Sequence, residues 1–306
     1  MYKRQNIDNN TWDKEILKKL NISKNILPDV KNSADNFGST NKKIVGVEIP
    51  ISAVLGDQQA AAVGQSCFKK GSIKSTYGTG AFVIMNTGSK KIFSKNKLLT
   101  TICYRLNGKN TFALEGSIFT AGAGVQWLRD KLKLINNAYD TEQIAKSKKN
   151  NEGVYVVPAF SGLGAPYWRP DARGVITGLT RDSDWKTLVR AVIESVAYQS
   201  YDLFNAMRKD GLKPNIVKID GGMVENNWFS QFLANIIDIK TERPKVLETT
   251  ALGVALFAGY QIGIFKSLDQ IKRKWKKDKT FKPKLSSTIR KKLLNGWKLS
   301  VDKTLL

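Results

Sequence analysis

Apolar residues recur at helical spacing in one long segment of the chain and in several shorter ones. Over residues 185–207, the positions that repeat three or four residues apart are Leu188, Val192, Val196, Gln199, Leu203 and Met207, which predicts a helix with one face in a core. Asp182 or Ser183 is the expected N-cap of this helix. Similar spacing or small residues predict helices over residues 57–64, 228–237 and 249–260 and from residue 122 onward.

Short apolar runs bounded by glycine, proline or polar clusters predict the strands. They cover residues 49–55, 72–77, 81–85, 98–104, 111–114, 154–158, 216–220 and 239–243. The last run ends at Pro244, which favours an edge strand. Residues 72–77 and 81–85 flank Gly78-Thr79-Gly80, which predicts a hairpin with glycines at its tip. Because strands alternate with helices, the sequence predicts an α/β fold with a mixed sheet flanked by helices.

Length and composition indicate how many domains the chain can form and whether it crosses a membrane. The chain has 306 residues, of which 42% are hydrophobic and 25% charged, enough for one large or two ordinary domains with real cores. No apolar run approaches the roughly 20 residues of a membrane-spanning helix, and polar residues follow the N-terminus. We therefore expect a cytoplasmic protein without a membrane partner.

Net charge and the use of cysteine and histidine limit the binding partners and catalytic groups to be expected. The net charge of +24 is typical of nucleic-acid binding, but the excess is mostly scattered lysine, so we expect no nucleic-acid partner. Two distant cysteines and no histidine argue against a disulfide framework or a zinc site. Without histidine, any acid–base chemistry falls to carboxylates, lysine or tyrosine.

Glycines stand at the ends of predicted strands in a way that favours phosphate binding. Gly221-Gly222 follows residues 216–220 and precedes a helix capped by Asn226, and Gly122 opens a helix whose first turn has little side-chain bulk. Bare backbone lets a phosphate or a flat ring approach, and N–H groups at a helix start bind anions. Each turn taken alone is equally consistent with close packing.

Taken together with a carboxylate, these turns indicate phosphoryl transfer. Asp57 comes directly after the predicted strand 49–55, close in sequence to the Gly78-Thr79-Gly80 tip. In that chemistry the protein positions the reacting oxygens, and a carboxylate beside the attacking hydroxyl accepts its proton. No P-loop or protein-kinase glycine loop is present in the sequence.

Four stretches carry a resemblance to a known family: GDQQAA at 56–61, STYGTG at 75–80, GLGAPYW at 162–168 and DGG at 220–222. At these residues the chain resembles the glycerol kinases of the FGGY family of carbohydrate kinases. The resemblance runs from residue 12 to about residue 297. It implies the actin-like ATPase (ribonuclease H-like) fold and ATP-dependent phosphorylation of glycerol to glycerol 3-phosphate.

The resemblance also implies roles for single residues. Asp57 would be the general base and, with Gln58 and Phe82, part of the glycerol site. Thr79 would meet the transferred phosphate, and the remaining ATP-site positions are Gly122, Gln126, Gly222 and Asn226, the last two towards the adenosine. ATP implies Mg²⁺, for which the sequence assigns no protein ligand.

Members of this family have two lobes that close on each other, and the chain corresponds to one complete lobe plus a remnant of the other. We expect a remnant of the N-terminal domain over 1–68, the C-terminal nucleotide-binding domain over 69–265 and a basic helical extension over 266–306. A single lobe cannot close over substrate, so we expect weak ATP binding and little or no turnover.

Several alternatives stay open on the sequence alone. A non-catalytic nucleotide-binding module, or a basic module that contacts nucleic acid, would share the same glycine turns and charge. The sequence does not decide between a natural fragment and an incomplete gene model, or between glycerol and a related polyol. It also leaves open a homo-oligomer and a separate chain that supplies the missing lobe.

Overall fold

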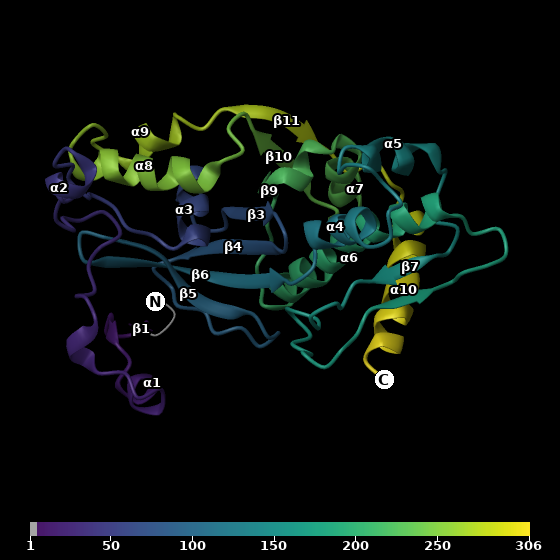
Figure 1. Ribbon diagram of the computed structural model, residues 1–306, viewed down its shortest axis with the longest axis horizontal. Coiled ribbons are helices and arrows are strands. Elements are labelled where there is room, and N and C mark those ends of the chain that lie inside the picture. Colours follow the sequence, from purple (N-terminus) through teal and green to yellow (C-terminus); the bar gives the residue numbers. More distant parts are fainter. Residues whose placement is uncertain (1–4) are drawn as a thin grey trace.

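A seven-stranded mixed sheet forms the centre of the computed structural model, which describes residues 5–306 (Figure 1). The strand order is β11-β10-β9-β3-β4-β6-β5. Strand β9 pairs in parallel with both β3 and β10, and the other neighbours pair antiparallel. The strands are β3 (Ile73–Tyr77), β4 (Ala81–Gly88), β5 (Leu99–Leu106), β6 (Lys109–Ile118), β9 (Ile216–Asp220), β10 (Lys240–Pro244) and β11 (Lys277–Phe281). The predicted α/β class with a mixed sheet is confirmed.

Helices cover both faces of this sheet. On one face, α3 (Asp57–Gly64) and α8 (Thr249–Gln261) stack on each other over the strands (Figure 1). They approach so closely that a Cβ atom on Gly253 would lie 1.8 Å from the carbonyl oxygen of Ala60, which explains their small residues. The other face packs against α6 (Trp185–Lys209) and α7 (Asn227–Ile237), with α4 (Gly122–Asp130) beside α6.

Helix α6 runs through the main core and confirms the long predicted helix. Val192, Val196 and Leu203 are all at least 99% buried. The N-cap is Asp184 rather than Asp182 or Ser183, because its side chain accepts the hydrogen bond of the Thr187 N–H at 2.8 Å. Three adjacent polar residues can each cap this helix, and the sequence alone does not decide which one reaches the open N–H groups.

Two strand predictions are wrong. Residues 49–55 form only isolated bridges, of Pro50 with Ser39 and of Ala53 with Ala34, because this segment pairs locally with the preceding residues outside the main sheet. Strand β10 is not an edge strand, since β11 pairs with it along its free side. The pairing shifts register between Arg243 and Pro244, where the proline lacks a donor.

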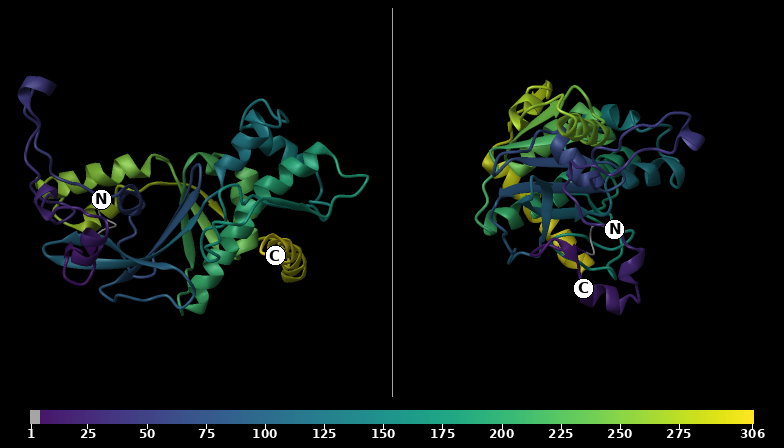
Figure 2. Two further views of the ribbon diagram at one scale, coloured as in Figure 1. Left: turned by 60° about the horizontal axis from the view of Figure 1, so that its bottom comes forward. Right: turned by 90° about the vertical axis from the view of Figure 1, so that its left-hand side faces the viewer.

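The N-terminal part of the chain is folded in short pieces. Trp12 and Leu17 are buried, and the segment around α2 projects from the rest of the protein (Figure 2, left). Its elements are β1 (Gln5–Asn6), β2 (Thr11–Trp12), α1 (Lys14–Lys19), the 3-10 helix η2 (Lys24–Ile26) and α2 (Lys42–Val45).

The C-terminal part returns to the core. Trp297 is 1% exposed and stacks on Tyr198 of α6 with ring centroids 5.4 Å apart. The remaining elements are α5 (Asp140–Ser147), β7 (Tyr155–Val157), β8 (Val175–Thr177), the 3-10 helix η3 (Gly222–Glu225), α9 (Leu268–Lys272) and α10 (Ser287–Thr304). Among residues 5–306, no helix combines the length and the apolar character that a membrane crossing requires.

Candidate active site

One cavity of about 540 Å³ collects all five residues predicted for the nucleotide, within the size range of small-molecule sites. It lies where the β3–β4 hairpin tip, the start of α4, the start of α5 and the turn after β9 meet. The five residues are far apart in sequence, so the fold brings them together: Thr79, Gly122, Gln126, Gly222 and Asn226.

The hairpin tip is held in place by backbone hydrogen bonds. Gly78 N–H donates to Gly80 O at 2.9 Å, which closes the tip. The chain before α4 is fixed to it, because Ala121 N–H donates to Thr79 O at 2.9 Å and Gly122 N–H to Gly78 O at 2.8 Å. In the described part of the chain, the N–H groups of Thr79 and Gly80 donate to no backbone carbonyl. Thr79 lines the cavity, so its N–H can serve an anion there.

The small residues at the start of α4 have a packing role as well as a place on the cavity wall. A Cβ atom on Gly122 would lie 2.6 Å from the Gly78 carbonyl oxygen, and one on Gly124 would lie 2.9 Å from a methyl group of Val192. The packing interpretation therefore holds for Gly124. Gly122 combines both roles, because it touches the hairpin tip and also lines the cavity.

The paired glycines after β9 have different environments. Gly221 has φ of +90°, and a Cβ atom there would lie 2.5 Å from the Tyr77 carbonyl oxygen. Only glycine fits that backbone position. At Gly222 an added Cβ would meet nothing within 4 Å, so this backbone faces open space at the cavity. Gly221 shapes the turn, and Gly222 leaves room beside it.

Asn226 joins the turn to two helices. Its side-chain oxygen caps α7 by accepting from Phe229 N–H at 2.9 Å, and its Nδ2 donates to Thr141 Oγ1 of α5 at 3.2 Å. Glu142, next along α5, accepts from the backbone N–H of Asn227 at 3.1 Å. The predicted Asn-capped helix is confirmed, and these bonds fix the wall of the cavity formed by α5.

The three residues predicted for the acceptor substrate lie outside that cavity. Asp57 is the exposed first residue of α3. Its Oδ1 accepts from Gln58 N–H at 2.9 Å, and its Oδ2 lies 3.4 Å from Gln58 Nε2. Phe82 is partly buried on β4, directly opposite Thr76 of β3. Strand β3 pairs with β4 at Phe82 and continues into the hairpin tip, so it connects the region of Phe82 to the nucleotide cavity.

Two buried charged residues beside these positions were missed by the sequence analysis. Lys74 of β3 is 0% exposed and Asp220 at the end of β9 is 1% exposed. Asp220 Oδ2 accepts from Gln65 Nε2 at 2.6 Å and from Thr249 Oγ1 at 2.7 Å. Burial raises the pKa of Asp220, and the charge of Lys74 opposes that rise. The available signal was a lysine inside a predicted buried strand, where a charge is costly.

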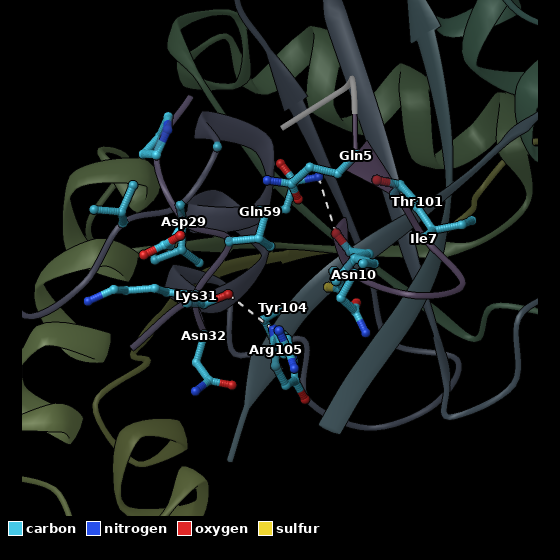
Figure 3. A pocket seen from close by; sticks show the side chains of 18 of the residues that line it. Gln5, Ile7, Asn10, Asp29, Lys31, Asn32, Gln59, Thr101, Tyr104 and Arg105 are labelled. Carbon is cyan, nitrogen blue, oxygen red and sulfur yellow. Dashed lines mark hydrogen bonds between the residues drawn. The ribbon is translucent and has the colours of Figure 1, made fainter. Parts of the chain in front are cut away.

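A second cavity, of about 400 Å³, separates the N-terminal segment from β5 (Figure 3). Figure 3 shows Lys31 and Asn32 on the left and Gln5 and Asn10 on the right, with Arg105 between them. None of the residues predicted for glycerol or ATP lines it. Within residues 5–306 there is also no cluster of three or more acidic, cysteine or histidine side chains arranged to hold a metal ion.

Comparison with known proteins places these features in a family. Residues 73–262 match the C-terminal domain of the FGGY family of carbohydrate kinases, and residues 3–64 match its N-terminal domain. The glycerol kinase of Alteromonas mediterranea is 53% identical over 295 residues, which are 96% of this chain and 60% of that protein. The glycerol kinase of Gluconobacter oxydans is 50% identical over 301 residues, 98% of this chain and 59% of that protein. The chain thus spans about three fifths of the length of these relatives.

Solved structures agree with the sequence relatives. The glycerol kinase of Plasmodium falciparum with ADP superposes with a TM-score of 0.90 at 40% identity, covering 99% of this chain and 61% of that one. The ligand-bound xylulose kinase of Lactobacillus acidophilus has a TM-score of 0.81 at 21% identity over 98% of this chain and 61% of that one, which shows the shared fold. The chain therefore belongs to the FGGY family of carbohydrate kinases and has the actin-like ATPase fold of that family.

Proposed function

We propose that this chain provides the nucleotide-binding lobe and the catalytic carboxylate of a kinase that transfers the γ-phosphate of ATP to glycerol. The observation that carries the proposal is the single cavity shared by Thr79, Gly122, Gln126, Gly222 and Asn226. Glycerol as the acceptor is supported by relatives named glycerol kinase at 50% identity and above. The adenine nucleotide is supported by the ADP in the Plasmodium falciparum structure.

The cavity residues fit a nucleoside triphosphate. Two N–H groups at the hairpin tip have no backbone acceptor in the described chain, and Thr79 adds an exposed hydroxyl beside them. We assign the transferred phosphate to this end. The open space over Gly222 accepts a flat group without a clash, so the adenosine lies towards Gly222 and Asn226.

Asp57 is the proposed general base. The acceptor hydroxyl oxygen forms a bond to the γ-phosphorus, the bond from that phosphorus to the β,γ-bridging oxygen breaks, and Asp57 takes the hydroxyl proton. The carboxylate is exposed at the first turn of α3, where the helix N-terminus interacts favourably with negative charge. Gln58 and Phe82 complete the acceptor side of the site in this proposal.

Magnesium fits the site as a companion of the nucleotide. Mg²⁺ commonly binds substrate phosphates with one or two carboxylates and keeps several waters, so the lack of a three-ligand cluster in residues 5–306 is compatible with it. Asp57 has an exposed carboxylate, and it would supply an oxygen. When bound, the ion neutralises charge on the phosphates.

Nucleotide binding and transfer are tested separately. Calorimetric titration with a nonhydrolysable ATP analogue is expected to show weak binding, and absence of heat at millimolar ligand would contradict the nucleotide assignment. Long incubation with glycerol and γ-labelled ATP is expected to give slow label transfer, which Asp57→Asn abolishes while analogue binding is retained. Equal transfer by Asp57→Asn and the unsubstituted chain would refute the role of Asp57.

A further inference from the structure

Lys74 is a fully buried lysine that the proposed chemistry does not use. It is 0% exposed in the middle of the sheet. Its ammonium donates to Gln58 Oε1 and, at 3.0 Å, to Thr76 Oγ1. A methionine of similar length would fill the same space without desolvating a charge, so the ammonium contributes its hydrogen bonds.

Burial lowers the pKa of Lys74, and negative charge on Asp220, Glu115 and Asp57 works in the opposite direction. These carboxylates on the surrounding elements therefore favour the charged ammonium. One of them, Asp220, precedes the Gly221-Gly222 turn of the nucleotide cavity, and another, Asp57, is the proposed base. The ammonium thus lies between the two halves of the site.

The hydrogen bond from Lys74 decides which way the Gln58 carboxamide points. An ammonium group has only donors, so it binds the oxygen of Gln58 and not the NH₂ group. The NH₂ group is then directed at Asp57, with Nε2 3.4 Å from Oδ2. If the amide turned over, its oxygen would face the carboxylate and its NH₂ would face the ammonium, and both contacts would be repulsive.

We propose that Lys74 is a positioning residue that fixes the Gln58 amide and, through it, the Asp57 carboxylate for reaction at the acceptor hydroxyl. This inference rests on the proposed function for its consequence in catalysis. Its structural half, the orientation of Gln58, can be measured without turnover.

The chain offers a matched control in Lys218. Lys218 lies opposite Lys74 on the neighbouring strand β9. Burial lowers its pKa as well. Its ammonium donates to the Gln65 carbonyl at 2.5 Å and lies 4.1 Å from the Trp275 ring centroid. Lys218→Met therefore removes a half-buried ammonium from the neighbouring position and leaves the Lys74–Gln58 hydrogen bond in place.

The structural half is tested by the side-chain NH₂ resonances of Gln58 in ¹⁵N-labelled protein, assigned by their loss in Gln58→Leu. We expect Lys74→Met to shift these signals and to accelerate their exchange with water, and Lys218→Met to leave both unchanged. Lys74→Gln keeps a polar group in place, removes the donor-only constraint and serves if Lys74→Met does not fold. Unchanged Gln58 signals in a folded Lys74 variant would overturn the proposal.

The catalytic half is tested by the slow glycerol phosphorylation assay. Lys74→Met is expected to lower transfer by about 10- to 100-fold, the range for misplaced catalytic groups, while analogue affinity stays within about twofold. Adding Lys74→Met to Gln58→Leu should cause little further loss of transfer, because Lys74 acts through Gln58. Equal effects of Lys74→Met and Lys218→Met, or additive losses in the double variant, would overturn it.

Failure of the proposed function gives a different result. If Asp57→Asn transfers phosphate as well as the unsubstituted chain, the general-base assignment fails, while the Gln58 signals still report on Lys74. If Asp57→Asn abolishes transfer and the Lys74 variants match the Lys218 control, the inference about Lys74 alone fails. The Asp57 variant therefore separates the two claims.

Discussion

The adjacent glycines of the turn after β9 should respond in opposite ways to added side chains. Gly221→Ala forces an alanine into φ of +90° and places its Cβ 2.5 Å from the Tyr77 carbonyl oxygen. Gly222→Val adds a side chain whose Cβ has no neighbour within 4 Å. We therefore expect the first change to damage the fold and the second to damage only ligand binding.

The magnitudes follow from these two environments. Backbone strain in a region reserved for glycine costs about 1 to 3 kcal/mol, and overpacking against a fixed carbonyl costs about 1 to 3 kcal/mol more. Gly221→Ala should thus lose about 2 to 6 kcal/mol of unfolding free energy. Gly222→Val should stay within about 0.5 kcal/mol in stability. Its bulk in the cavity should weaken nucleotide binding by about 10- to 200-fold.

Thermal unfolding and calorimetric titration with a nonhydrolysable ATP analogue measure both effects on the same samples. We expect Gly221→Ala to melt well below the unsubstituted chain and Gly222→Val to melt with it. Unaltered analogue affinity in Gly222→Val would refute the placement of the nucleotide beside this glycine. An unchanged melting temperature in Gly221→Ala would refute the assigned backbone conformation.

Three further predictions concern single residues. Burial raises the pKa of Asp202 to about 6, from 3.8. The folded state therefore binds this proton more tightly than the unfolded state does. The stabilisation of the folded state by this proton is fully present below pH 3.8 and is lost as pH rises towards 6. In urea unfolding, the stability of the unsubstituted chain relative to Asp202→Asn should fall by about 3 kcal/mol between these limits, and a flat difference would contradict this. Asn226→Ala should lose about 1 kcal/mol with the α7 cap, whereas Asn226→Asp should keep the cap and weaken analogue binding through added negative charge; equal melting temperatures for the two variants would argue against the cap. Burial raises the pKa of Cys67 to about 11 and that of Cys103 still further, so neither thiol should react with Ellman's reagent in the folded protein at pH 8, and rapid labelling without unfolding would show that they are accessible.

Local glycine signals predicted two turns that line the candidate site. The Gly78-Thr79-Gly80 tip and the Gly221-Gly222 turn depend on backbone requirements that the sequence displays directly. Their position around one cavity, however, follows from the pairing of β3 with β9, which no local pattern encodes. The family resemblance supplied that arrangement in advance, and the single cavity is consistent with it.

Other features depended on contacts between distant segments. Strand β11 is charged at Lys277, Asp278 and Lys279, so it lacks a strand pattern and forms because β10 offers an unpaired side. The run at 49–55 has the pattern of a buried strand, yet Ile49 and Val54 are 47% and 53% exposed. Tertiary pairing decided both cases, since a short apolar or polar run does not by itself specify its partner.

Lys74 shows the same limit at the site. Its residue type argues for an exposed position, and its burial is explained only by acceptors on two elements, Gln58 on α3 and Thr76 on its own strand. Neither acceptor is recognisable before the helix and the sheet are packed together. Sequence analysis therefore found the exposed carboxylate at Asp57 and missed the group that orients its neighbour.

The most direct test of the central claim is an experimental structure of this chain with a nonhydrolysable ATP analogue and Mg²⁺. We predict phosphate oxygens within hydrogen-bond distance of the Thr79 N–H group and the adenosine beside Gly222 and Asn226. A nucleotide bound elsewhere on the protein, or a cavity that stays empty at millimolar analogue, would contradict it.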